Sequence, residues 1–475
     1  MQVAVADTPL SELDSDLVAV FVFDGDGLPP ELAEARGAAD VKGGFRKQEL
    51  IHPERPERVL VVGLGDRDDF SAERARVAAA IAAKSAAAHR AGSLALVLPD
   101  AGEPETAAAA LVEGAILASY RFERFKSSAG DDDEPQGRVE ELTLVTGADV
   151  DAAAQVARVA SEAANRAREL QDLPSNFVTP SHLAERALEL AVAHDGLSCE
   201  VMDRDEIVER GMGGLEAVSK GSDEPPKLIV LRHERPGPLL GLVGKGVTFD
   251  TGGISIKPAA SMHEMKMDMS GAAAVIEAMG AIAELGLDVN VVAVVPSTEN
   301  MPSGHAVKPG DIITQLNGKT VEVNNTDAEG RLILADALAY AVELGAERIV
   351  ELSTLTGAVL IGLGSTYAAL ISNDDDLAEA VQAAAERSGE LAWRLPLHEE
   401  YKQLTKGKVA DLTNAASKRK AGTIYAGSFL EEFVDERPFA HLDIAGTGWD
   451  VGREYVGSGP TGYGVRLLVD LARNV

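Results

Sequence analysis

The stretch Asn324-Asn325-Thr326-Asp327-Ala328-Glu329-Gly330-Arg331-Leu332 lies where a strand-like pattern gives way to a helix-like pattern. Its charged residues Asp327, Glu329 and Arg331 occupy alternating positions, so a single extended segment would direct the three side chains the same way. Three charges of mixed sign directed at one place are rarely a packing device. The stretch therefore predicts a metal site with a cationic side chain beside it.

A second group of charged residues follows an almost wholly apolar run at residues 239–250. That run predicts a strand buried in the sheet, so Asp250 would stand at its carboxyl end, where open α/β sheets place ligands. Glycines flank Lys245 and follow Asp250, which lets the backbone approach closely and turn sharply. The acidic candidates for one shared site are Asp250, Asp268, Asp327 and Glu329.

Four carboxylates that converge without cations would repel one another, and some would stay protonated. Two divalent ions would neutralise them, and ligation without histidine or cysteine suits magnesium, manganese or zinc. Such a pair of ions activates a water for hydrolysis. Lys257 and Arg331 would then stabilise negative charge that develops in the transition state. Each residue alone is more often a cap or a solvated group, but their joint occurrence favours the metal site.

The first part of the chain alternates between predicted strands and helices, which is typical of a largely parallel, helix-covered sheet. Strands are expected at residues 16–23, 58–64, 93–98 and 141–145. Helices are expected at residues 71–92 and 103–125. The acidic segment 130–135 predicts an exposed loop.

A long helical pattern at residues 151–170 contains the expected domain boundary, which divides the chain into residues 1–165 and 166–475. Beyond it, strands are expected at residues 227–232, 239–250, 288–296 and 348–354. Asn317-Gly318 predicts a tight hairpin turn. The predicted fold is α/β with two domains, each a mostly parallel or mixed sheet covered by helices, and the catalytic domain is C-terminal.

Length and charge restrict the possible partners. At 475 residues, the chain is long enough for two or more domains. Its net charge of −32 argues against nucleic acid and anionic membrane as partners, because both need a basic footprint. No secretory signal or membrane-spanning run is visible. The single cysteine, Cys199, fits a reducing compartment, so we expect a cytoplasmic protein.

Two other classes compete with a peptidase on the residues alone. A two-metal phosphoesterase also fits paired carboxylates, but such sites usually recruit histidines, and none accompanies these motifs. A non-catalytic scaffold or nucleic-acid-binding protein is the third reading. The net charge weighs against DNA binding, and the intact set of charged residues weighs against a catalytically inactive protein. No Gly-x-Ser-x-Gly motif occurs, so a serine nucleophile elbow is not expected.

The octapeptide 325–332 matches, residue for residue, the signature of the leucyl aminopeptidase family, also called cytosol aminopeptidases. That family's spacings are also met by Lys245, Asp250, Lys257 and Asp268. The sequence therefore resembles this family, strongly from about Pro174 onward and loosely before it. The resemblance implies a metal-dependent aminopeptidase, a hydrolase that releases N-terminal amino acids from peptides.

The resemblance also implies ligand roles for five residues. Asp250 and Glu329 would bridge two divalent ions, Mn²⁺ or Zn²⁺, with Mg²⁺ as a further candidate. Asp327 would complete one metal site, while Lys245 and Asp268 would complete the other. Lysine ligates only as the neutral amine, so Lys245 needs a strongly depressed pKa, which burial beside two dications can supply.

Two basic residues would act on the substrate, again by resemblance. A bridging water or hydroxide would attack the scissile carbonyl, and Lys257 would polarise that carbonyl and hold the oxyanion. Arg331 would hold a bicarbonate ion that serves as general base. The free α-amine of the substrate would bind one metal, so the expected substrates are peptides with an unblocked N-terminus.

The family resemblance also implies a pocket for the first side chain of the substrate. It would be lined by Met265, Thr354, Gly357 and Ala445. Leu355 would help to position the substrate backbone. Methionine, a threonine methyl group and small residues favour Leu or Met over charged side chains. Members of the family are typically homohexamers, so a homohexamer is expected here.

Overall fold

The computed structural model describes most of the chain, namely residues 1–127, 137–416 and 420–475. The acidic loop predicted at residues 130–135 lies outside these ranges. Packing divides the chain into two compact units: unit 1 is Met1–Asn165 with Gly452–Gly457, and unit 2 is Arg166–Val451 with Ser458–Val475. Within the described ranges, no helix is both long and apolar enough to cross a bilayer.

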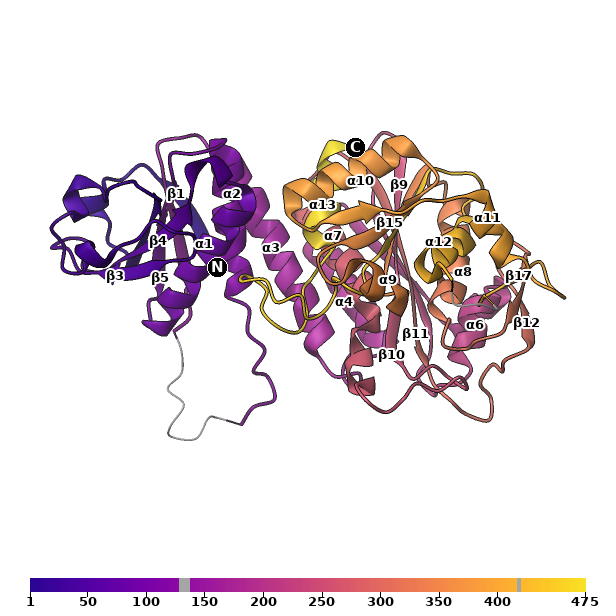
Figure 1. Ribbon diagram of the computed structural model, residues 1–475. Coiled ribbons are helices and arrows are strands. Elements are labelled where there is room, and N and C mark those ends of the chain that lie inside the picture. The colour runs from indigo at the N-terminus through magenta and orange to yellow at the C-terminus, as the bar shows by residue number, and fades with distance from the viewer. Residues whose placement is uncertain (128–136, 417–419) are drawn as a thin grey trace. The chain divides into compact units, whose positions relative to one another are not determined.

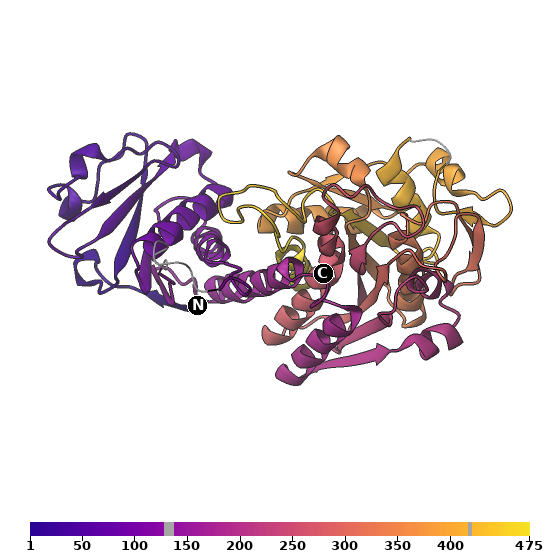
Figure 2. The same cartoon turned by 90° about the horizontal axis from the view of Figure 1, so that it is seen from below.

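Unit 1 contains a six-stranded sheet, which can be followed in Figures 1 and 2. Its strands, in spatial order, are β1 (Gln2–Ala6), β6 (Glu141–Val145), β5 (Ser93–Val97), β2 (Leu17–Phe23), β4 (Val59–Gly65) and β3 (Gln48–Ile51). Neighbours are parallel except β3, which runs antiparallel to β4 at one edge. The predicted strands at residues 16–23, 58–64, 93–98 and 141–145 are therefore confirmed to within a residue or two.

Helices cover one face of this sheet. The helices that lie or begin in unit 1 are α1 (Ala72–Ala88), α2 (Pro104–Ala118) and α3 (Asp151–Asp172). Ser71 caps α1, because its side chain accepts a hydrogen bond from the N–H of Arg74. The helix predicted at residues 103–125 ends earlier, at Ala118. On the other face, Leu32 from a short 3-10 helix joins Val18 and Val20 in the core.

Residues Gly452–Gly457 pack with unit 1 although they lie late in the sequence. Tyr455 is 1% exposed, and its hydroxyl donates to the Glu73 carboxylate at 3.0 Å. Glu454 pairs with Lys84 at 2.6 Å. The pattern of residues 166–475 alone does not indicate this placement, because the contacts that determine it are hundreds of residues distant in the sequence.

Unit 2 is built on a nine-stranded mixed sheet. Eight strands follow one another in space: β16 (Ala392–Arg394), β15 (Ala368–Ser372), β18 (Phe439–Asp443), β14 (Arg348–Ser353), β9 (Leu239–Gly244), β11 (Asn290–Asn300), β8 (Lys227–His233) and β7 (Leu197–Met202). The ninth, β10 (Gly246–Asp250), pairs with the far end of β11. A smaller sheet consists of β12 (Asp311–Thr314), β13 (Thr320–Val323) and β17 (Leu412–Thr413). The predicted hairpin at Asn317-Gly318 joins β12 to β13.

Helices cover both faces of the large sheet; α7 and α13 lie on one side of it and α8 and α12 on the other (Figure 1). The helices of unit 2 are α4 (Pro180–Ala193), α5 (Arg204–Glu209), α6 (Gly213–Ser219), α7 (Ser270–Glu284), α8 (Gly330–Glu343), α9 (Gly357–Leu363), α10 (Asp375–Ser388), α11 (Glu399–Lys402), α12 (Gly422–Glu431) and α13 (Val465–Asn474). The predicted α/β fold, with helix-covered sheets, is confirmed.

The prediction of a single strand at residues 239–250 is wrong in one respect. The segment forms two strands, β9 and β10, which are separated at Lys245. The Lys245 N–H donates to the carbonyl of Leu352, and its carbonyl accepts from Ala272 at the start of α7. A side chain at Gly244 would collide with the backbone of Gly271, at 2.5 Å from its carbonyl oxygen. This close approach of helix and strand turns the chain at Lys245.

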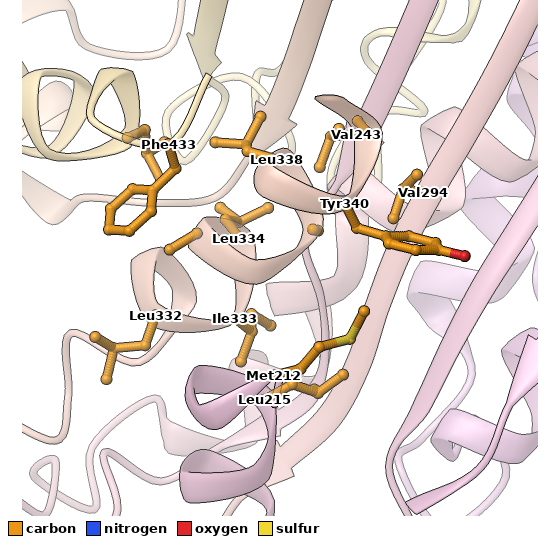
Figure 3. Packing of buried hydrophobic residues seen from close by; sticks show 14 of the residues in the cluster. Met212, Leu215, Val243, Val294, Leu332, Ile333, Leu334, Leu338, Tyr340 and Phe433 are labelled. Carbon is orange, nitrogen blue, oxygen red and sulfur yellow. The ribbon is translucent and has the colours of Figure 1, made fainter. Parts of the chain in front are cut away.

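The helix that begins within the octapeptide, α8, is buried along nearly its whole length. Figure 3 shows Leu332, Ile333, Leu334 and Leu338 of this helix packed among apolar side chains from neighbouring elements. Apart from Arg331, Asp336 and the terminal Glu343, its side chains are almost all apolar, and a helix that is apolar on nearly all sides belongs inside the protein. Its position is therefore well determined, and the charged residues at its N-terminus are attached to a rigid support.

One buried carboxylate fixes α8 to its surroundings. Oδ2 of Asp336 accepts hydrogen bonds from the N–H groups of Gly214 (2.8 Å) and Leu215 (2.9 Å), and Oδ1 accepts from the N–H of Leu316 (2.8 Å). Burial raises the pKa of Asp336 to about 7, and these hydrogen bonds offset only part of that effect.

Replacement of Asp336 with asparagine is expected to lower the free energy of unfolding by about 1–3 kcal/mol, because an NH₂ group would then face a buried backbone N–H. The folded-state pKa of about 7 lies above the ordinary 3.8, so the stability that Asp336 contributes falls as the pH rises between those values. Urea denaturation at about pH 5 and about pH 8 should thus show the larger loss at the lower pH. An equal loss at both would contradict the assignment.

Candidate metal centre

The site lies at the edge of the unit 2 sheet where the parallel neighbours β18, β14 and β9 end. A cavity of about 290 Å³ opens there. Its lining includes every predicted site residue, namely Lys245, Asp250, Lys257, Met265, Asp268, Asp327, Glu329, Arg331, Thr354, Leu355, Gly357 and Ala445. The structure therefore brings together all of the residues that the sequence suggested, over a sequence separation of 200 residues (245 to 445).

Three of the acidic residues form a compact cluster. Asp250 at the end of β10, Asp327 and Glu329 each place one carboxylate oxygen within 4.8 Å of the others. Asp268 lies on the 3-10 helix Met262–Met269 and joins them through Lys245. The Lys245 ammonium lies 2.7 Å from Asp268 Oδ2 and 2.8 Å from Glu329 Oε1.

A second lysine contacts the same cluster from the cavity side. The Lys257 ammonium lies 2.8 Å from Asp250 Oδ2 and also pairs with Asp327. Its main-chain N–H donates to the carbonyl of Thr251, which closes the glycine-rich loop after β10. The side chain of Lys257 is partly exposed, whereas Lys245 is buried. Lys257 is thus the lysine that a bound molecule can reach.

The octapeptide does not have the extended conformation that its alternating charges predicted. Asp327 lies in a turn, and Glu329 is the N-cap residue of α8 with helical dihedral angles (φ −75°, ψ −36°). Arg331 belongs to the first helical turn. The three side chains still converge on one cavity, but a turn followed by a buried helix brings them together, and strand alternation does not.

Burial and charge perturb the cluster strongly. Burial raises the pKa of Asp268 to about 8 and also raises the pKa values of Glu329 and Asp327. Burial lowers the pKa of Lys245, but the surrounding carboxylates outweigh it and raise that pKa overall. A depressed pKa, as lysine ligation requires, is therefore not a property of this arrangement by itself. A cation would have to displace the proton.

The donor set fits divalent cations. When all are ionised, Asp250, Asp268, Asp327 and Glu329 carry four negative charges against two on Lys245 and Lys257, so the group has an excess of two for a cation to neutralise. Among the described residues, Glu329 Oε2 is buried without a hydrogen-bond partner. A buried carboxylate oxygen normally has a hydrogen-bond partner, so an unpaired one beside other carboxylates is free to ligate a hard cation.

Arg331 also lines the cavity, and burial lowers its pKa. It donates from Nη1 to the carbonyl of Asn414 (2.7 Å) and lies over the ring of Tyr425, 5.4 Å from its centroid. Nε has no partner, and no carboxylate of the described chain forms an ion pair with it. Burial raises the pKa of Tyr425 to about 12, so that ring is neutral. A buried guanidinium that forms no ion pair suits an anion.

Several residues that hold the site together were missed by sequence reasoning. Asn300 donates to Asp250 Oδ1 (2.8 Å) and to the carbonyl of Thr326 (3.0 Å). The Thr326 hydroxyl donates to the carbonyl of Gly252 (2.7 Å), and this hydrogen bond connects the octapeptide to the loop after β10. Nothing in the local pattern distinguishes these residues from ordinary turn residues, because their partners lie 26 to 74 residues away.

The loop after β14 is held by a further residue that the sequence did not single out. Oδ1 of Asp443 accepts hydrogen bonds from the N–H groups of Leu355 (3.1 Å) and Ala445 (3.3 Å), and Oδ2 accepts from the hydroxyl of Thr356. These contacts fix two predicted pocket residues. Met267, Thr356 and Leu360 also line the cavity and were missed.

Comparisons with known proteins agree with this site. A family model described as "Cytosol aminopeptidase family, catalytic domain" matches residues 165–469, and the N-terminal domain model of the same family matches residues 31–129. The chain belongs to the cytosol aminopeptidase family. It is 45% identical to a probable cytosol aminopeptidase of Roseiflexus castenholzii, over 100% of this chain and 99% of that protein.

Other relatives of this aminopeptidase extend the comparison to solved structures. A probable cytosol aminopeptidase of Solibacter usitatus is 44% identical and covers 99% of both chains. The bottromycin maturation enzyme BotP, solved also in complex with Mn, is 36% identical with a TM-score of 0.88, over 97% of this chain and 99% of its own. A mutant tomato leucine aminopeptidase is 34% identical, also with a TM-score of 0.88, over 100% and 97%. The aminopeptidase is thus a hydrolase of a metal-dependent family.

Proposed function

We propose that this aminopeptidase removes N-terminal amino acids from peptides with two divalent metal ions in the cavity at the edge of the unit 2 sheet. The observation that carries the proposal is the cluster of Asp250, Asp327 and Glu329, with ligand oxygens within 4.8 Å of one another. We assign catalysis to residues 166–475 and a role in assembly to residues 1–165.

The proposed ligand roles are those that the family resemblance implies. Asp250 and Glu329 would bridge both ions, Asp327 would complete one site, and Lys245 with Asp268 would complete the other. Mn²⁺ and Zn²⁺ are the proposed ions, and a relative of this chain was solved with Mn. When bound, two such ions supply a water activated for attack on the scissile carbonyl. Lys245 must give up its proton to serve as a ligand.

The two remaining basic residues are proposed to act on the substrate. Lys257 borders the cavity with its ammonium group partly exposed, so it can donate a hydrogen bond to the oxyanion that forms on the attacked carbonyl. Arg331 presents a buried guanidinium without an ion pair, which supports bicarbonate as its anion and as the general base. The cavity's lining includes no histidine, which agrees with a base of this kind.

The rest of the cavity is proposed to bind the first side chain of the peptide. Met265, Thr354, Gly357 and Ala445 present thioether, methyl and small groups, and Leu355 borders the path of the substrate backbone. Gly357 has open space where a side chain would begin. Such a lining favours leucine or methionine over aspartate or glutamate.

The assembly and location of the aminopeptidase are proposed from the family to which it belongs. We infer a homohexamer in the cytoplasm. Light scattering after size-exclusion chromatography measures the number of copies directly.

The decisive experiment compares leucine p-nitroanilide with its N-acetyl derivative, with a phosphate monoester, and with anilides of methionine, alanine and glutamate. We expect hydrolysis of leucine p-nitroanilide, at least about 10-fold slower reaction with the alanine anilide, and none with the blocked amine. A bicarbonate-depleted buffer should slow the reaction. Preference for glutamate would contradict the pocket, and hydrolysis of the phosphate ester alone would contradict the peptidase.

A further inference from the structure

A buried asparagine outside the metal ligands contacts the octapeptide at several points. Asn414 follows β17 and is fully buried. Its Oδ1 accepts hydrogen bonds from the main-chain N–H groups of Asn324 (2.8 Å) and Asn325 (3.3 Å). Its Nδ2 donates to the main-chain carbonyls of Asn325 (2.7 Å) and Ala328 (3.3 Å). A single side chain therefore satisfies backbone groups at both ends of the turn.

The main chain of Asn414 is fixed as well. Its N–H donates to the carbonyl of Glu322 at 3.0 Å, which attaches the residue to β13. Its carbonyl accepts the hydrogen bond from Arg331 Nη1. Among the described residues, Arg331 makes no ion pair, and this contact is the one hydrogen bond of its side chain. Asn414 thus contacts the backbone that carries the acidic ligands and also the guanidinium.

We propose that Asn414 is a positioning residue that fixes Asp327, Glu329 and Arg331 relative to one another. Residues 324–329 belong to neither a strand nor a helix, so no regular hydrogen-bond ladder fixes them. Ala328, whose carbonyl Asn414 binds, lies between the two acidic ligands. When this contact is lost, the turn has more conformations available, and the two carboxylates no longer stay at ligand distance from Asp250.

The effect on metal binding rests on the proposed metal centre, whereas the effect on the turn does not. Partners that orient metal ligands typically change metal affinity by about 10–100-fold when they are removed. A residue that only stabilised the fold would change the unfolding transition and leave the affinity of the folded protein unchanged. The two possibilities are therefore distinguishable by binding measurements on folded protein.

The test uses the full chain with Asn414→Ala, Asn414→Asp and the control Asn373→Ala. Asn373 also accepts a backbone hydrogen bond, from the N–H of Phe439 (2.8 Å), and donates to the carbonyl of Arg437 (3.1 Å), but it does not touch the octapeptide. Hydrogen exchange of the peptide covering residues 324–331 and the dissociation constant of Mn²⁺ by calorimetry are measured for each.

With Asn414→Ala, we expect faster exchange in residues 324–331 and Mn²⁺ binding at least about 10-fold weaker. Asn414→Asp keeps the acceptor for the N–H groups of Asn324 and Asn325 but loses the donor to the carbonyl of Ala328. It should therefore show a smaller increase in exchange than the alanine variant but should also weaken Mn²⁺ binding, and it serves if the alanine variant does not fold. Asn373→Ala should change neither quantity.

Two results would overturn the proposal: unchanged exchange in residues 324–331 of folded Asn414 variants, or faster exchange with an unchanged Mn²⁺ dissociation constant. Absence of Mn²⁺ binding to the wild-type protein would instead contradict the proposed metal centre and, with it, the positioning role of Asn414. Faster exchange in residues 324–331 would still show in that case that Asn414 restrains the turn. The experiment therefore distinguishes an incorrect assignment of the metal centre from an incorrect assignment of the contact between Asn414 and the turn.

Discussion

Replacement of Glu329 with alanine is expected to lower kcat/KM for leucine p-nitroanilide by at least about 10³-fold. Glu329 is 2% exposed, lies in the acidic cluster, and has one carboxylate oxygen without a hydrogen-bond partner. It is the proposed bridge between the two ions, so its loss removes ligands from both. Metal ions contribute several kcal/mol to transition-state stabilisation, and each 1.36 kcal/mol corresponds to a factor of ten in rate.

The measurement pairs kinetics with metal content. Each protein is stripped with a chelator, reconstituted with Mn²⁺ or Zn²⁺, dialysed, and assayed for bound metal and for activity. The control is Glu299→Ala, since Glu299 is a partly buried glutamate on β11 that bonds to Ser222 and does not line the cavity. It should retain metal and activity. A Glu329→Ala protein that binds two ions and keeps more than about a tenth of the activity would refute the bridging role.

Replacement of Lys257 with methionine is expected to lower kcat by about 10²–10³-fold, with a smaller change in KM. The ammonium group is placed to stabilise charge that develops only in the transition state, and such interactions affect kcat more than ground-state binding. Lys257 also neutralises Asp250 and Asp327, so its removal leaves those carboxylates freer to bind a cation. Mn²⁺ should therefore bind the variant at least as tightly as it binds the wild type.

This combination of slower catalysis with undiminished metal affinity identifies a catalytic lysine. The matched control is Lys266→Met, because Lys266 donates to the carbonyl of Asp172 and lies over Trp449, outside the cavity lining. Its kcat should stay within about two-fold of the wild type. If the Lys257→Met protein lost metal in proportion to its activity, Lys257 would be a structural part of the ligand cluster and not an oxyanion donor.

The sequence was informative wherever a residue type carries its own chemistry. Buried strands such as β2, β4 and β14 were predictable, because apolar, β-branched runs have few other uses. The break at Lys245 was not predictable, because it depends on the close approach of Gly271 across the sheet edge. The early end of α2 was likewise missed, because residues 119–125 contain neither glycine nor proline to mark where the helix stops.

Most of the candidate site could also be proposed from the sequence, but for a partly mistaken reason. The charges of the octapeptide do converge, yet a turn at Asp327 and the N-terminus of α8 bring them together where an extended segment had been expected. Asn300, Asn414 and Asp443 were invisible at that level. Each acts through hydrogen bonds to partners far away in the chain, and an isolated amide or carboxylate gives no sign of which partner it will find.

The sequence by itself determined which groups are available: four carboxylates, two lysines and an arginine, in spacings that match one family. Only the tertiary structure decided that they meet. Asp268 lies on the 3-10 helix Met262–Met269 and Thr354 follows β14, yet the fold brings their side chains, 86 residues apart, within 2.7 Å of each other. Residue type and periodicity are local properties, whereas convergence is fixed by strand order and by buried hydrogen bonds, which exist only once the chain has folded.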